Sequence, residues 1–110
     1  MQDDTRYYLL KHIHQNPNIS QRELAAKAGI SLGKTNYCLR ALIEKGLVKA
    51  DNFRKNSKKI SYLYMLTPQG LEEKTKVTYR FWKSKQKEYE QLKAELEDLS
   101  QEVQEELEQR

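Results

Sequence analysis

The first part of the chain alternates short apolar stripes with turn-forming residues. Hydrophobic positions three and four residues apart predict a helix over residues 4–15, which Asp3 or Asp4 can cap. Its apolar stripe is formed by Leu9, Leu10 and Ile13. The helix is expected to end before Pro17, because proline restricts the preceding residue and lacks a backbone donor.

A second, shorter helix is predicted directly after this break. Ser20 and Glu23 have the spacing of a capping box, in which the Ser20 hydroxyl accepts from the Glu23 backbone N–H and the carboxylate reaches back. The inward positions of this helix are Leu24, Ala25 and Ala28. Gly29 can adopt the left-handed conformation that ends it.

The third predicted helix covers residues 32–45, with Ser31 as its cap and Gly46 at its end. One face is suited to the core and consists of Thr35, Cys38, Leu39 and Leu42. The other face is rich in hydrogen-bond donors and consists of Lys34, Asn36, Tyr37 and Arg40. Packing explains only the first face, so the second must be directed at something else.

The period changes to two after Gly46. Residues 47–50 and 60–66 are predicted to be strands, with a charged loop over 52–59 between them. One face of the second strand carries Ile60, Tyr62, Tyr64 and Leu66. Thr67 and Pro68 then begin a helix that we expect to continue to the C-terminus.

Composition and charge narrow the class of protein. Only 37% of the 110 residues are hydrophobic, which suits one small core. The sequence lacks an apolar run of the roughly 18 residues needed for a membrane span, and its single Cys suits the reducing cytoplasm. Residues 1–87 carry 18 Lys and Arg against 7 Asp and Glu, whereas residues 88–110 carry 2 against 9. A basic segment of this kind favours a polyanion-binding domain, and the alternative is that the charge only keeps the protein soluble.

Three helices followed by a basic hairpin form the layout of a winged helix-turn-helix. The predicted fold is therefore mainly α with a small β-hairpin, followed by the long C-terminal helix. In this layout the third helix enters the major groove, and the hairpin contacts the backbone or minor groove. The hairpin loop is strongly cationic, because it contains Arg54, Lys55, Lys58 and Lys59.

The donor-rich helix carries the side chains expected to contact double-stranded DNA. Lys34 and Arg40 can meet phosphates or the O6 and N7 atoms of guanine, and Asn36 can pair with adenine. Backbone N–H groups beside Gly33 can approach a phosphate. Tyr37 can pack on a thymine methyl group or bind a phosphate. With the loop cations, the candidate DNA-binding residues are completed by Gln21, Arg22 and Ser31.

The stretch SQRELAAKAGISLGKTNYCLRALIEKGLV, then DNFR, then LTPQG before a long helix, resembles the MarR family of bacterial transcription regulators. It is most similar to the small members associated with exopolysaccharide gene clusters. The resemblance implies a winged-helix dimer that binds an operator, with contacts from residues 31–40, a wing over 51–59 and Arg54 in the minor groove. Larger members interleave N- and C-terminal helices around a ligand pocket. This chain is shorter at its N-terminal side, so the resemblance does not extend to small-molecule control.

The last part of the chain has a seven-residue apolar repeat. The a positions are Trp82, Tyr89, Leu96 and Val103, and the apolar d positions are Leu92 and Leu99. This repeat predicts a coiled coil between two copies, dividing the chain into a DNA-binding domain (1–70) and a dimerisation helix (71–110). The alternative is that the helix folds back on its own domain. Glu88, Glu95 and Glu102 at g positions weakly favour a parallel pair.

Other kinds of chemistry find little support in the sequence. Cys38 lies on the inward face, where a thiol is usually an inert hydrophobe rather than a redox switch. His12 and His14 lie on different helix faces, so we expect no metal site, no cofactor and no enzymatic activity. The alternative function is a protein-interaction module that uses the coiled coil, with the winged helix as a scaffold. RNA binding is a third possibility, but the pattern predicts no exposed stacking platform.

Overall fold

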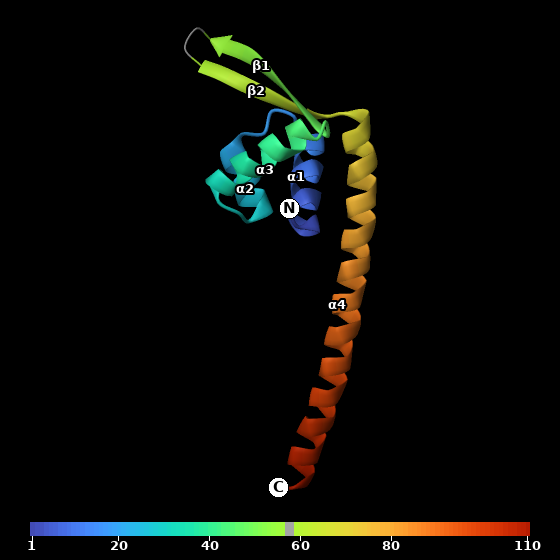
Figure 1. Cartoon of the computed structure of the whole chain (residues 1–110). Helices are drawn as coiled ribbons and strands as arrows, with labels where there is room; N and C mark the ends of the chain where they lie inside the picture. Colours follow the sequence, from blue (N-terminus) through green and yellow to red (C-terminus); the bar gives the residue numbers. More distant parts are fainter. Residues whose placement is uncertain (57–58) are drawn as a thin grey trace.

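The computed structural model contains four helices and one β-hairpin among the residues that it describes (Figure 1). It describes residues 1–56 and 59–110, and of residues 52–62 it describes only backbone in the strands. The elements are α1 (Asp3–Gln15), α2 (Gln21–Ala28), α3 (Leu32–Glu44), β1 (Val48–Asn56), β2 (Lys59–Leu66) and α4 (Pro68–Glu108). The predicted fold class and element order are confirmed.

The start of α1 differs from the prediction. Gln2 occupies the N-cap position and its side chain makes no capping hydrogen bond, so Asp3 and Asp4 lie inside the first turn. The expectation that either aspartate caps the helix is therefore wrong. Asp3 is instead engaged by Arg80 of α4, whose Nε donates to Oδ2 over 2.8 Å. Both carboxylates still stabilise α1, because negative charge is favourable at a helix N-terminus.

The turn between α2 and α3 follows the local sequence signals. The Ser20 hydroxyl accepts a hydrogen bond from the Glu23 backbone N–H at 3.1 Å, which confirms that half of the capping box. The Ser31 hydroxyl accepts from the Lys34 N–H at the same distance. Gly29 has a φ of +68°, in the left-handed region that a side chain would strain. Gly29 and the Ser31 cap form the turn from α2 into α3, and the Ser20 cap fixes where α2 begins.

The core lies where α1, α2, α3, the base of the hairpin and the start of α4 meet. Its buried members are Leu9, Leu10, Ile13, Ile19, Leu24, Cys38, Leu39, Leu42, Val48, Tyr64 and Val77. The predicted inward face of α3 is confirmed, since all four of its residues are buried. Thr35 satisfies its buried hydroxyl by donating to the Ser31 carbonyl over 2.9 Å.

The hairpin is longer than the sequence pattern indicated. β1 and β2 are antiparallel, and their register runs from Val48 opposite Leu66 to Asn56 opposite Lys59, with an irregularity between Arg54 and Asn56. The predicted loop over residues 52–59 is therefore wrong for most of its length. Backbone pairing across the two strands continues through a charged sequence, because the ladder is formed by backbone N–H and C=O groups, whatever the side chains.

A tight junction joins the hairpin to α4. The Thr67 hydroxyl accepts from the Gly70 N–H at 3.0 Å and donates to the Gly46 carbonyl, so it caps α4 and holds the base of β1. Pro68 occupies the first turn, as predicted. A Cβ atom on Gly70 would overlap the Leu47 carbonyl oxygen. The start of α4 is thus fixed against the strands.

The first part of α4 packs against α1, and the rest extends away from the domain (Figure 1). Arg6 of α1 donates to Glu73 over 2.9 Å, and the Tyr7 ring stacks on Phe81 at 4.2 Å. Beyond residue 81, every residue of α4 is exposed. The chain measures 75 × 29 × 20 Å, with a radius of gyration of 20.5 Å against about 13 Å for a compact chain of 100 residues. The alternative that the helix folds back on its own domain is wrong.

None of the described helices combines the length and apolar character needed to cross a membrane.

Candidate nucleic-acid interface

The outward face of α3 is a surface of donors that the described part of the chain leaves largely uncovered. Lys34, Tyr37 and Arg40 are exposed, and Tyr37 retains 75% of its accessible surface. Asn36 is half-buried. The 3.6-residue period of the helix separates these side chains from the buried face, as the sequence predicted. Because α4 extends away from this surface, the tail of the chain does not cover α3 (Figure 1).

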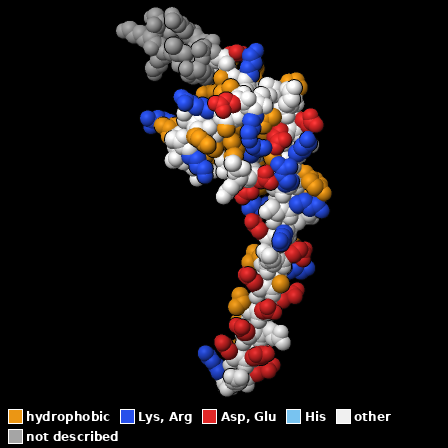
Figure 2. All heavy atoms as spheres, viewed as in Figure 1, with side chains coloured by type: hydrophobic (Ala, Val, Ile, Leu, Met, Phe, Trp, Pro, Cys, Tyr) orange, Lys and Arg blue, Asp and Glu red, His pale blue; other side chains and the backbone are white. Residues whose placement is uncertain are grey.

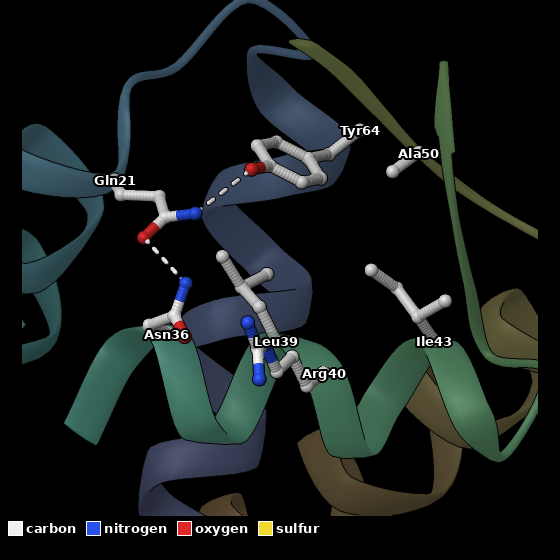
Figure 3. A pocket seen from close by; sticks show the side chains of 7 residues that line it. All are labelled: Gln21, Asn36, Leu39, Arg40, Ile43, Ala50 and Tyr64. Carbon is white, nitrogen blue, oxygen red and sulfur yellow. Dashed lines mark hydrogen bonds between the residues drawn. The ribbon is translucent and has the colours of Figure 1, made fainter. Parts of the chain in front are cut away.

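Two hydrogen bonds connect the donor face of α3 to α2 and to the hairpin (Figure 3). Asn36 Nδ2 donates to Gln21 Oε1 over 3.3 Å, and Gln21 Nε2 donates to the Tyr64 hydroxyl over 3.1 Å. Asn36 comes from α3, Gln21 from the first turn of α2 and Tyr64 from β2. We call these three residues the amide relay. It fixes the orientation of Asn36 and relates it to the position of the hairpin.

The amide relay lines a hollow of about 220 Å³ between α3 and the base of the hairpin. Figure 3 shows Arg40 and Ile43 at the α3 side of this hollow and Ala50 at the β1 side. A second hollow of about 460 Å³ lies on the other flank of α3, where Lys34, Tyr37 and Lys45 face the N-terminus. The donor side chains of α3 line both hollows: Asn36 and Arg40 line the first, and Lys34 and Tyr37 line the second.

The other residues of the helix-turn-helix that were predicted to contact DNA lie at the N-terminal ends of α2 and α3. Arg22 is exposed in the first turn of α2, beside the half-buried Gln21. Gly33 is exposed in the first turn of α3, and a Cβ atom there would meet nothing within 4 Å. Ser31 is also exposed, and its hydroxyl caps α3. Of the predicted DNA-binding residues in the helix-turn-helix, the structure joins Gln21 and Asn36 directly by a hydrogen bond. Arg22, Ser31 and Gly33 are exposed near the start of α2 or α3.

The basic wing extends from this surface. Arg54 and Lys55 fall within β1 and Lys59 begins β2, so the backbone there is part of the hairpin. The side chains of these three residues, and all of Lys58, lie outside the described residues. Their predicted contacts with the DNA backbone or minor groove stay predictions.

Tyr64 is the member of this surface that sequence analysis missed. The alternation of β2 placed Tyr64 on one face of the strand without saying which way that face points, and its side chain is only 5% exposed. Its hydroxyl reaches Gln21, which lies 43 residues earlier in the chain. The available signal was a general one, because a buried tyrosine hydroxyl usually has a hydrogen-bond partner. Nothing in the sequence identified which residue that partner would be.

Two other kinds of site, a metal centre and a reactive thiol, would need suitably placed side chains in the described part of the chain. Within it, no group of three or more His, Cys, Asp or Glu side chains could hold a metal ion. Cys38 is 2% exposed and packs in the core, as predicted for a structural thiol.

Comparison with known proteins identifies this arrangement. Residues 2–49 match a family model described as winged helix-turn-helix DNA-binding. The fold is a winged helix-turn-helix. No curated protein sequence matches the chain.

Solved structures share the winged helix-turn-helix fold at low sequence identity. The regulator PcaV from Streptomyces coelicolor is 20% identical, with a TM-score of 0.64 over 74% of this chain and 56% of that one. A MarR-family protein from Mycobacterium tuberculosis is 23% identical, with a TM-score of 0.56 over 68% and 55%. FabT from Streptococcus pneumoniae, solved in complex with DNA, is 17% identical, with a TM-score of 0.57 over 76% and 56%. The chain thus spans little more than half the length of these neighbours.

Proposed function

We propose that this protein is a transcriptional regulator that binds operator DNA as a homodimer. Residues 1–70 act as the DNA-binding domain and residues 71–110 as the dimerisation helix. The observation that carries the proposal is the donor face of α3, where Lys34, Tyr37 and Arg40 are exposed and no other described part of the chain covers them. A regulator of this kind works in the cytoplasm of a bacterium.

The donor face of α3 has the chemistry of base readout in the major groove. Arg40 is exposed on the central turns of the helix and can pair with guanine O6 and N7. Asn36, held by Gln21, presents an amide suited to adenine. Lys34 and Arg22 are exposed near the N-terminal ends of α3 and α2, where they can neutralise phosphates.

The charge of the chain and its similarity to solved structures also support DNA as the partner. Residues 1–87 carry an excess of 11 basic over acidic residues, which favours association with a polyanion. The neighbour FabT was solved in complex with DNA, and PcaV is described as a transcriptional regulator. Resemblance to MarR regulators assigns the wing cations Arg54, Lys55, Lys58 and Lys59 to the backbone and minor groove. A protein-interaction module is not favoured, because it gives no role to the donors on α3.

The exposed stripe of α4 supports the homodimer. The predicted seam residues are between 52% and 63% exposed in the single chain: Trp82, Tyr89, Leu92, Leu96, Leu99 and Val103. An exposed apolar stripe on a free helix gains stability by pairing, and a second copy offers the same stripe. Two-fold symmetry also matches the two half-sites of an operator.

The finer family assignment belongs to the proposal as well. The quoted stretches around α2, α3 and the start of α4 are most similar to the small MarR regulators associated with exopolysaccharide gene clusters. We therefore propose genes of that kind as targets. No small-molecule effector is part of the proposal.

Alanine substitution on α3 tests the proposal directly. Lys34→Ala, Asn36→Ala and Arg40→Ala are each expected to weaken binding to a selected operator, by about 1–3 kcal/mol for a base-contacting side chain. Lys76→Ala on α4 is a matched control, because Lys76 is exposed and lies away from α3. Fluorescence anisotropy at several salt concentrations gives both affinity and salt slope, and loss of one phosphate contact should reduce that slope by about 1. Unchanged affinity in all three variants would refute DNA binding by this face.

A further inference from the structure

The direction in which two copies of α4 pair can be derived from the charges along its apolar stripe. We propose that two copies of α4 pair antiparallel. The acidic segment of each helix (residues 99–107) then lies along the basic segment of the other (residues 79–87). This inference rests on the proposed homodimer and adds to it the geometry of the interface. The weak preference for a parallel pair, based on the g-position glutamates, is reversed by three observations.

The first observation concerns the two charged residues that interrupt the seam. Lys85 and Glu106 occupy d positions, in line with Leu92 and Leu99. In a parallel, in-register pair each would face its own copy, which would bury one pair of ammonium groups and one pair of carboxylates. In an antiparallel pair, a positions face d positions. Lys85 then faces Val103 of the second copy, within one helical turn of its Glu106, so opposite charges come together.

The second observation concerns the two ends of the stripe. Tyr79 and Leu107 are large exposed apolar residues at e positions, with 58% and 62% of their surfaces accessible. In an antiparallel pair, e positions face e positions. A register that aligns Leu92 with Leu96 of the second copy also sets Tyr79 opposite Leu107. A parallel pair would instead set Leu107 against Glu102 of the second copy.

The third observation is the segregation of charge along α4. Residues 79–87 carry four Lys or Arg and no acidic residue, whereas residues 99–107 carry three Glu and no basic residue. The lower part of α4 in Figure 2 accordingly shows acidic side chains with hydrophobic ones between them. The same antiparallel register lays each basic segment along the acidic segment of the second copy, whereas a parallel pair sets like charges together.

The g-position glutamates oppose this arrangement only weakly. In an antiparallel pair, Glu88 lies near Glu102 of the second copy, and the two Glu95 residues face each other. These carboxylates flank the seam and remain in water, where salt screens their repulsion. Glu88 is also paired within its own helix, because Lys85 Nζ donates to its Oε2 over 3.2 Å. Lys85 and Glu106 occupy d positions of the seam, where like charges that face each other would lose hydration. The seam therefore decides the direction.

Antiparallel pairing separates the two DNA-binding domains along the coil. The domain is attached to α4 near Gly70 and Val77, which are its buried residues. With the two-fold axis near residue 94 and a rise of 1.5 Å per residue, the attachment points are about 60 Å apart. Half-sites would then be separated by about two turns of DNA rather than one, since a turn spans about 34–36 Å.

Disulfide crosslinking in a Cys38→Ala background tests the direction. Tyr89→Cys and Leu99→Cys proteins, carrying tags of different size, are oxidised separately and as a refolded mixture. Antiparallel pairing aligns position 89 with position 99 of the second copy, within the 4.4–6.8 Å Cα separation of a disulfide. The mixture should therefore yield the crosslinked heterodimer, and Leu99→Cys alone should yield little crosslinked homodimer.

Each other outcome is distinguishable. Efficient crosslinking of Leu99→Cys alone would establish parallel pairing and overturn the inference, while leaving the proposed homodimer intact. A dimer in which neither sample crosslinks would also overturn it. If light scattering finds the Cys38→Ala protein monomeric at micromolar concentration, the proposed homodimer itself fails.

A charge exchange provides an independent test without cysteines. Lys85→Glu and Glu106→Lys should each raise the dimer dissociation constant severalfold, and the double variant should restore it. Failure of the double variant to restore dimerisation would contradict the antiparallel seam.

Discussion

Asn36, Gln21 and Tyr64 come from three different elements, yet two hydrogen bonds of 3.3 and 3.1 Å join their side chains. The consequence is that the one amide on the donor face of α3 is oriented before DNA arrives. Side chains that are ordered in advance lose less entropy on binding. The amide relay also makes the orientation of Asn36 depend on the position of β2, which continues into the wing.

Removing the tyrosine hydroxyl should therefore affect both stability and recognition. Tyr64→Phe leaves the half-buried amide of Gln21 without that acceptor, so we expect the free energy of unfolding to fall by about 1 kcal/mol. Operator affinity should also fall, because Gln21 loses its anchor on β2 and then holds Asn36 less firmly. Urea unfolding and anisotropy measure the two effects, with Tyr8→Phe on α1 as the control, because Tyr8 lies outside α3 and outside the seam. Affinity equal to that of the original protein would show that the relay does not position Asn36.

His12 provides a pH-dependent term in stability. It lies half-buried on α1, with its ring stacked on Tyr8 at a centroid distance of 6.3 Å. Burial lowers the pKa of His12, and the positive charges of Lys27 and Lys11 lower it further. The unfolded chain therefore binds this proton more readily than the folded one, so stability is lost as the pH falls through the ordinary histidine value of about 6.5.

The His12 contribution can be isolated by substitution. Between pH 7.5 and 5.5, the melting temperature of the original protein should fall by more than that of His12→Gln, because the variant has no proton to bind at this position. Thermal unfolding by circular dichroism measures the difference, with His14→Gln as the matched control on the exposed face. Equal losses in the original protein and His12→Gln would contradict this role.

For single residues, the sequence predicted which helix face is buried and which is exposed, but it did not predict which side chains form hydrogen bonds with each other. The buried positions Thr35 and Leu42 and the exposed Lys34 and Arg40 follow from helical periodicity alone, which is a local property. The bond between Gln21 and Tyr64 depends on how two distant elements pack. No local pattern encodes such a contact.

Among the elements, the hairpin and α4 meet at a closely packed junction. Gly70 lies against the Leu47 carbonyl, and the Thr67 hydroxyl joins α4 to Gly46. This contact fixes where the long helix leaves the domain. It therefore also fixes how a dimer formed through α4 holds its DNA-binding domains.

A methyl group at Gly70 should disturb this junction. Gly70→Ala would overlap backbone that cannot move freely, so we expect a loss of about 1–3 kcal/mol in unfolding free energy. Gly33→Ala is a matched control near the start of another helix, where nothing lies within 4 Å, and should be neutral or slightly stabilising. Urea unfolding compares the two. A Gly70→Ala protein as stable as Gly33→Ala would contradict the close packing described here.

Element boundaries were predictable where a side chain or a glycine marks them. Ser20, Ser31 and Thr67 cap their helices as the sequence indicated. The cap of α1 was predicted wrongly, because Asp3 lies inside the first turn and its carboxylate accepts a hydrogen bond from Arg80 of α4, a contact between elements far apart in the sequence. The extent of the hairpin was also missed, since pairing of backbone groups does not require an apolar sequence.

For the molecule as a whole, the exposed stripe of α4 is the feature that a single chain leaves unpaired. The seven-residue repeat predicted this stripe, and the structure confirms that it does not fold back on the domain. The direction of pairing was harder to predict from the repeat. The glutamates that flank the seam favoured parallel pairing, whereas the charged seam positions and the segregated charges favour antiparallel pairing.

A charge in the middle of the stripe should abolish pairing. Leu96→Glu places a carboxylate in the seam, so the protein should become monomeric at micromolar concentration while the domain of residues 1–70 stays folded. Gln91→Glu adds the same charge at an outer position and should remain dimeric. Light scattering and circular dichroism make the comparison. A dimeric Leu96→Glu protein would mean that pairing does not use this stripe.

The central claim is that the donor face of α3 recognises a DNA sequence, and selection of bound sites from random duplex DNA tests it most directly. We expect the full-length protein to enrich an inverted repeat, and the Lys34→Ala and Arg40→Ala variants to lose that enrichment. Recovery of no preferred sequence, or of the same repeat at equal strength by both variants, would contradict the claim.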